Sequence, residues 1–87
     1  MENIKMISAK EAREIANGRA NELVQKHLNE IMQEIEKEAK QGSTWTNHYL
    51  GESYATEIAS TVGKILKELG YKINYIFKHI NIGWKAE

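Results

Sequence analysis

The chain has 87 residues, equal numbers of basic and acidic residues (12 of each), and neither cysteine nor proline. This length predicts one domain with a small core, and the lack of cysteine excludes disulfides, thiolate metal sites and a thiol nucleophile. The N-terminus lacks the apolar core of a signal peptide and no stretch is apolar enough to span a membrane, so we expect a cytoplasmic protein without membrane contact.

Although the net charge is zero, the charges are unevenly distributed. Between Ile58 and Ala86 five lysines stand against one glutamate, whereas between Glu30 and Glu38 four glutamates stand against Lys37. Such polarity is typical of a phosphate-binding end or of two faces that meet on assembly. A solvated surface with uneven charge explains it equally well.

An apolar stripe at helical spacing predicts a long first helix, from about Ser8 to Gln41. The stripe consists of Ala12, Ile15, Ala16, Ala20, Leu23, Val24, Leu28, Ile31, Ile35 and Ala39. Ser8 and Glu11 have the spacing of a capping box, and Gly42 follows the expected end. Gly18 marks either a kink or a close approach of another backbone; we expect one continuous helix because the stripe keeps its phase.

A helix of this length extends about 50 Å, whereas a compact chain of this size has a radius of gyration of about 12 Å. The stripe is therefore longer than one copy can cover, unless the helix breaks near Gly18. We expect a homo-oligomer, a dimer or a tetramer, with its binding crevices between subunits.

A loop and a second helix are expected next. Glycines at both ends of residues 42–51 break the helical pattern, so this segment is predicted to be a loop. The second helix is predicted from about Glu52 to Leu69. Its apolar face comprises Tyr54, Ile58, Val62, Ile65, Leu66 and Leu69. Gly70 and Tyr71 have the pattern of a Schellman closure after the helix.

Alternating apolar residues predict two short strands within residues 71–85. The simplest arrangement is a hairpin that turns around Lys78 and His79, although the Asn-Gly signal of a tight turn is absent. Two strands alone are marginal in water, so we expect the hairpin to lie on a helix or to add to a strand of another subunit. The predicted fold is α+β: a long N-terminal helix, a loop, a second helix and a C-terminal β-hairpin in one oligomeric domain, residues 1–87.

The sequence shows no catalytic or metal-binding pattern. His27, His48 and His79 fall in a helix, a loop and a turn without an i, i+4 partner, so we expect surface or boundary histidines and no metal. There is no Gly-x-Ser-x-Gly element and no glycine-rich phosphate loop. We therefore expect no enzyme activity and no cofactor.

The predicted loop is different, because it gathers aromatic and short polar side chains just before a helix. The candidate ligand-binding residues are Trp45, Thr46, Asn47, His48, Tyr49 and Ser53. Aromatic rings stack on nucleobases with about 1–3 kcal/mol each, short polar groups bind base edges or phosphates, and a helix N-terminus favours an anion. The alternative is that Trp45 and Tyr49 fill a gap against the long helix and that Trp84 anchors the hairpin to the core.

Three segments carry a family resemblance: IMQEIEKEAKQG (residues 31–42), LKELGYKI (66–73) and INIGW (80–84). Together they resemble a widespread group of small tailed-phage proteins with a long N-terminal helix, an LKxLGY helix end and a closing I-x-I-x-W strand. Some of these proteins are anti-CBASS sponges, oligomers that trap cyclic dinucleotide immune signals without cleaving them. The resemblance implies sequestration of a 3′,3′-cyclic dinucleotide in pockets between subunits, and it assigns no individual binding residue.

The leading hypothesis is thus a phage immune-evasion protein that acts in the host cytoplasm by capturing a cyclic nucleotide. A winged-helix-like DNA-binding protein is the first alternative, and a break at Gly18 would supply its third helix. Zero net charge and the long loop argue against duplex DNA, because a helix-turn-helix needs a turn of three or four residues. A virion or host-protein interaction module without a small ligand is the second alternative.

Overall fold

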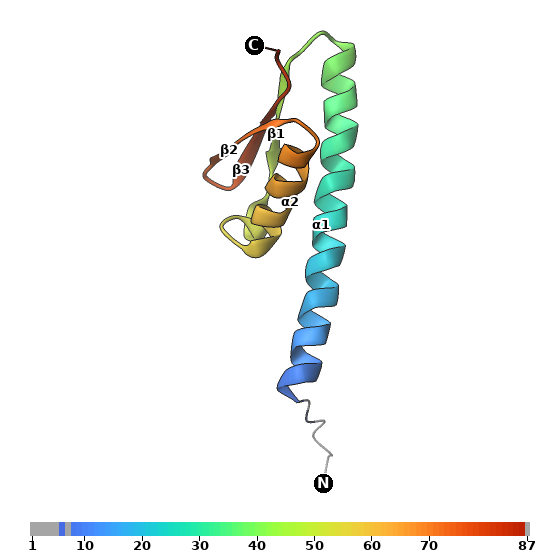
Figure 1. The fold of residues 1–87 in the computed structure, drawn as a ribbon, viewed down its shortest axis with the longest axis vertical. Coiled ribbons are helices and arrows are strands. Elements are labelled where there is room, and N and C mark those ends of the chain that lie inside the picture. Colours follow the sequence, from blue (N-terminus) through green and yellow to red (C-terminus); the bar gives the residue numbers. More distant parts are fainter. Residues whose placement is uncertain (1–5, 7, 87) are drawn as a thin grey trace.

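The computed structural model describes residue 6 and residues 8–86. Its elements in chain order are α1 (Ala9–Lys40), β1 (Trp45–Tyr49), the 3₁₀ turn η1 (Gly51–Ser53), α2 (Glu57–Glu68), β2 (Lys72–Ile76) and β3 (His79–Gly83). The three strands form one antiparallel sheet in the order β1-β3-β2. Figure 1 shows α1 running along the whole molecule, with its N-terminal half projecting beyond α2 and the sheet. The predicted α+β class is confirmed.

The signal-peptide prediction rests on the first residues of the chain, and most of these lie outside the described part. None of the helices within residues 8–86 combines the length and the apolarity that a membrane crossing requires.

The first helix forms as its local signals predict. Ser8 is the N-cap, and its Oγ accepts a hydrogen bond from the Glu11 backbone N–H at 3.1 Å. The helix continues through Gly18, where an added Cβ would meet no atom within 4 Å outside the neighbouring helix backbone, so no other described segment approaches that glycine. The winged-helix alternative needed a break there, and α1 has none.

Only part of the apolar stripe on α1 is covered. Ile31 and Ile35 are buried, whereas Ala12 and Ala16 are exposed and Ile15 is 64% exposed. At 3.6 residues per turn Ile15 lies about 160° around the helix from Ile31, because the stripe drifts around the axis. The molecule measures 64 × 21 × 20 Å with a radius of gyration of 16.8 Å. It is therefore elongated, and its own body leaves the start of the stripe, Ala12, Ile15 and Ala16, in solvent.

The prediction of a loop over residues 42–51 is wrong, because the segment contains β1. Its residues pair with β3 in register, with Thr46 opposite Ile82 and His48 opposite Ile80. The central strand β3 is thus paired on both sides. The hairpin obtains its third strand from its own chain, which removes the need for a strand from another subunit.

The second helix starts later than predicted. Residues 51–53 form the 3₁₀ turn, and Ala55 has a φ of 61°, a left-handed conformation that interrupts the helix. The helix begins at Glu57, after the N-cap Thr56, whose Oγ1 accepts from the Ile58 backbone N–H at 3.2 Å. The capping signal lies at Thr56 rather than at Glu52.

The end of α2 matches the prediction. Gly70 has a φ of 100°, and the Tyr71 backbone N–H donates to the Leu66 carbonyl at 3.1 Å, which completes the Schellman closure. Leu69, predicted on the apolar face, is 62% exposed because it is the C-cap residue, at the point where the chain turns away. The hairpin turn is formed by Phe77 and the left-handed Lys78, one residue earlier than predicted.

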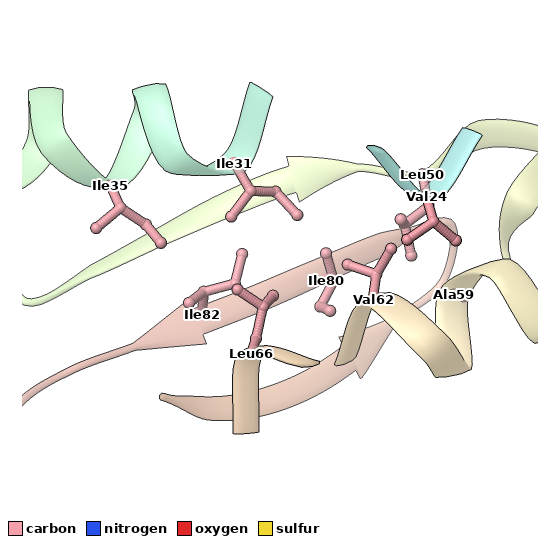
Figure 2. Packing of buried hydrophobic residues seen from close by; sticks show 9 residues of the cluster. All are labelled: Val24, Ile31, Ile35, Leu50, Ala59, Val62, Leu66, Ile80 and Ile82. Atoms are coloured by element: carbon pink, nitrogen blue, oxygen red, sulfur yellow. The ribbon is translucent and has the colours of Figure 1, made fainter. Parts of the chain in front are cut away.

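The core lies between the two helices and one face of the sheet. Figure 2 shows side chains from α1, α2, β3 and the residue after β1 meeting there: Val24, Ile31, Ile35, Leu50, Ala59, Val62, Leu66, Ile80 and Ile82. Because α1 packs on β1 and α2 packs on β2 from this side, the opposite face of the sheet is covered by no element of the described chain.

Candidate functional site

The strand β1 divides the predicted ligand-binding residues between two environments. Successive side chains of a strand point to opposite faces. Trp45, Asn47 and Tyr49 lie on the uncovered face, where Trp45 is 59% and Tyr49 58% exposed. Thr46 and His48 point inward and are buried. The alternative in which Trp45 and Tyr49 fill a gap against the long helix is therefore wrong.

The register of the sheet defines the outer sheet face. It comprises Trp45, Asn47 and Tyr49 of β1, His79, Asn81 and Gly83 of β3, and Lys72, Asn74 and Ile76 of β2. Asparagines of all three strands form its middle row, since Asn81 pairs with both Asn47 and Asn74. Trp45 and Tyr49 flank this row on β1, and none of the nine residues is acidic.

Hydrogen bonds hold part of the asparagine row in place. The Asn47 Nδ2 donates to Asn81 Oδ1, and His79 Nδ1 lies 2.7 Å from Asn47 Oδ1. An amide oxygen only accepts, so His79 Nδ1 carries the hydrogen. The His79 ring also stands against Tyr49, with centroids 5.2 Å apart and an interplanar angle of 60°. Within residues 8–86 the Asn74 side-chain amide has no hydrogen-bond partner, so it is available to a ligand.

The inward side of β1 joins a buried polar chain. His27 Nδ1 lies 2.9 Å from His48 Nε2, and His27 Nε2 lies 3.3 Å from Ser53 Oγ. Neutral histidines satisfy both contacts, with one donor and one acceptor at each. Burial lowers the pKa of both histidines, and the neighbouring His27 lowers the pKa of His48 further. The chain links α1, β1 and η1 within the core.

Three of the predicted site residues are therefore structural. His48 and Ser53 are buried in the polar chain, and Thr46 is buried with its Oγ1 3.5 Å from Glu34 Oε2. The prediction of surface or boundary histidines is wrong for His27 and His48, because a contact across 21 residues of sequence leaves no local signal.

The structure also adds residues that the sequence did not single out. Asn74, His79 and Asn81 join the outer sheet face because the strand register places them beside Asn47. Their alternation with apolar residues in the hairpin was the available signal that they share one face. Only the pairing of β1 with β3 places that face beside Asn47. Trp84 is half-buried, with its ring 6.3 Å from that of Tyr71, in agreement with the predicted anchoring role.

Comparison with known proteins places the chain in a phage family. The family model described as Phage T4 Y10B protein matches residues 2–79, from before α1 to the first residue of β3. No curated protein matches the chain, and no solved structure matches it. The resemblance to small phage proteins is thus confirmed in its general form, while the family's description names no ligand and no activity. The chain belongs to the phage T4 Y10B protein family.

Proposed function

We propose that this phage protein binds a nucleotide on its outer sheet face and holds it without chemical conversion. The observation that carries the proposal is the exposure of two aromatic rings, Trp45 and Tyr49, on either side of the asparagine row. They are four residues apart on one strand, or about 13 Å at 3.3 Å per residue. Two stacking surfaces at that separation suit a ligand with two bases. The likeness to sponge proteins then favours a cyclic dinucleotide.

The chemistry of the outer sheet face supports an anionic, base-containing ligand. Aromatic rings stack on bases of any kind, and asparagine amides pair with the donor and acceptor edge of an adenine. Lys72 lies in the same row as Trp45, separated from it only by Gly83, so a positive charge stands near the larger ring. None of the nine residues that define the face carries a carboxylate that would repel a phosphate.

Capture without conversion is consistent with the groups present on this face. Its one histidine, His79, already donates to Asn47. The remaining polar groups are amides, a phenol and an ammonium, which bind and orient a ligand rather than attack it. A protein that captures a nucleotide signal without converting it removes a fixed number of molecules per copy, so its copy number must match that of the signal.

We also infer that the working form is an oligomer assembled through the first half of α1. Ala12, Ile15 and Ala16 form an apolar face that the body of the same chain leaves exposed. Most of the stability of a helix in a protein comes from the packing of its apolar face, so the projecting part of α1 gains from a second apolar surface. A two-fold helix pair between identical copies is the simplest way to cover it.

Isothermal titration calorimetry with 3′,3′-cyclic dinucleotides tests the binding proposal. We expect binding by the full chain, and a Kd about 5 to 150 times weaker for Trp45→Ala, since one base–aromatic stack contributes about 1–3 kcal/mol. Leu69→Ala is the matched control, because it removes an exposed apolar side chain at the end of α2, and it should leave the Kd unchanged.

Equal affinity of Trp45→Ala and the parent chain would place the ligand elsewhere and contradict the proposal. Binding to duplex DNA but to no cyclic dinucleotide, with an affinity that falls steeply as the salt concentration rises, would favour the DNA-binding alternative. No heat with any nucleotide, from a folded sample, would leave the protein-interaction alternative.

A further inference from the structure

A second surface lies away from the outer sheet face, in a groove between α2 and the edge strand β2. The hollow has a volume of about 620 Å³. Its lining includes Tyr54, Ala59, Ser60, Lys64, Lys67 and Tyr75. We call it the α2–β2 groove. Ligand pockets in proteins have volumes of about 300–1,000 Å³, with an apolar wall and a few polar groups, and this groove has both properties.

The tyrosine wall of the groove is held in place by its neighbours. The Tyr75 hydroxyl donates to the Ala59 carbonyl at 2.8 Å, across the middle of α2. This crossing needs Gly63, because a Cβ at that position would overlap the Tyr75 hydroxyl. Glycine in a helix interior lowers helix stability. The helix therefore retains an unfavourable residue at the one point where Tyr75 crosses it.

The approach to the groove also contains a strained residue. Ala55 lines the hollow with a φ of 61°, a conformation that costs a residue with a Cβ some free energy. It follows Tyr54, whose ring packs edge-on against that of Phe77, with the ring centroids 5.6 Å apart. Phe77 is 70% exposed, so the aromatic wall continues from the groove to the turn of the hairpin.

The charge of the groove is positive and uncompensated. Ser60, Lys64 and Lys67 have helical spacing and line the same side of α2. Neither lysine forms an ion pair with any part of the chain that the structure describes, and no lining residue is acidic. Both ammonium groups are thus available to a negative group that sits beside the tyrosine wall.

We propose that the α2–β2 groove binds a small organic anion, with a flat apolar body against Tyr54 and Tyr75 and a phosphate or carboxylate at Lys64 and Lys67. This site is separate from the outer sheet face. It does not depend on nucleotide binding there, and a protein with both sites can respond to two different ligands.

The test is an NMR titration of the ¹⁵N-labelled full chain with phenyl phosphate. We expect shifts of the amides that line the groove, and a Kd about tenfold weaker in the double variant Lys64→Gln/Lys67→Gln, the loss expected of two exposed charge contacts. The control is Lys26→Gln/Lys85→Gln, which removes the same charge from exposed positions elsewhere and should keep the Kd of the parent chain.

Two further probes separate the parts of the proposed ligand. Inorganic phosphate and benzyl alcohol should each bind more weakly than phenyl phosphate, because each offers only one half of the contacts. Two results would overturn the proposal: inorganic phosphate that binds as tightly as phenyl phosphate, or a Kd for phenyl phosphate that is unchanged in the double variant Lys64→Gln/Lys67→Gln. Trp45→Ala should leave phenyl phosphate binding intact, so this site and the outer sheet face fail or succeed separately.

Discussion

At the scale of single residues, the buried pair His27 and His48 predicts a stability that depends on pH. Burial holds the pKa of both below their ordinary value of 6.5. The unfolded chain therefore takes up protons as the pH falls below 6.5, while the folded pair resists them. We expect full stability above 6.5 and a falling free energy of unfolding below it, measured by urea denaturation at several pH values.

The His48→Gln variant keeps a hydrogen-bonding side chain but removes one titrating ring. Its pH dependence should fall to roughly half, since one of the two histidines no longer resists protonation. Asn74→Gln, which alters an exposed amide that does not titrate, serves as the control and should retain the slope of the parent chain. A slope that is the same in all three proteins would show that the pair does not couple folding to pH.

At the scale of elements, the contact between α2 and β2 predicts a strong coupling between Gly63 and Tyr75. In a Tyr75→Ala background, Gly63→Ala should raise the free energy of unfolding by about 1 kcal/mol, the difference in helix propensity. In the parent chain the added Cβ would displace the Tyr75 hydroxyl from the Ala59 carbonyl, and the gain should disappear or reverse.

Urea denaturation of the four proteins of this double-mutant cycle measures the coupling. Additive effects would mean that Tyr75 does not occupy the place above Gly63. Gly18→Ala is a useful comparison, because an added Cβ meets no atom within 4 Å there. The substitution should therefore stabilise α1 equally with Tyr75 and with Tyr75→Ala.

At the scale of the whole molecule, the exposed half of α1 predicts self-association. We expect sedimentation velocity to show a dimer or a tetramer, and Ile15→Glu to shift it toward the monomer, because the charge would have to be buried in an apolar contact. The control Gln25→Glu adds the same charge at an exposed position on another side of the helix and should leave the assembly intact.

A single subunit that stays monomeric at high concentration would contradict the assembly. The nucleotide proposal would then be limited to one subunit, since the outer sheet face would have to bind its ligand without a second copy. Comparing calorimetry before and after Ile15→Glu therefore shows whether binding and assembly are linked.

Local signals in the sequence determined much of this fold. The N-cap at Ser8, the continuity of α1 through Gly18, the closure at Gly70 and the C-terminal hairpin all depend on residues a few positions apart. The interactions that decide them are hydrogen bonds and backbone preferences within one or two turns of chain. Such interactions leave a pattern that a single sequence displays.

The tertiary structure alone decided the rest. Residues 45–49 became a strand because β3, thirty or more positions later, offered an unpaired edge. That pairing sent Trp45 and Tyr49 outward and His48 inward to meet His27, so one predicted site became an exposed face and a buried polar chain. The choice depends on packing and on non-local hydrogen bonds, whose energies no short segment contains.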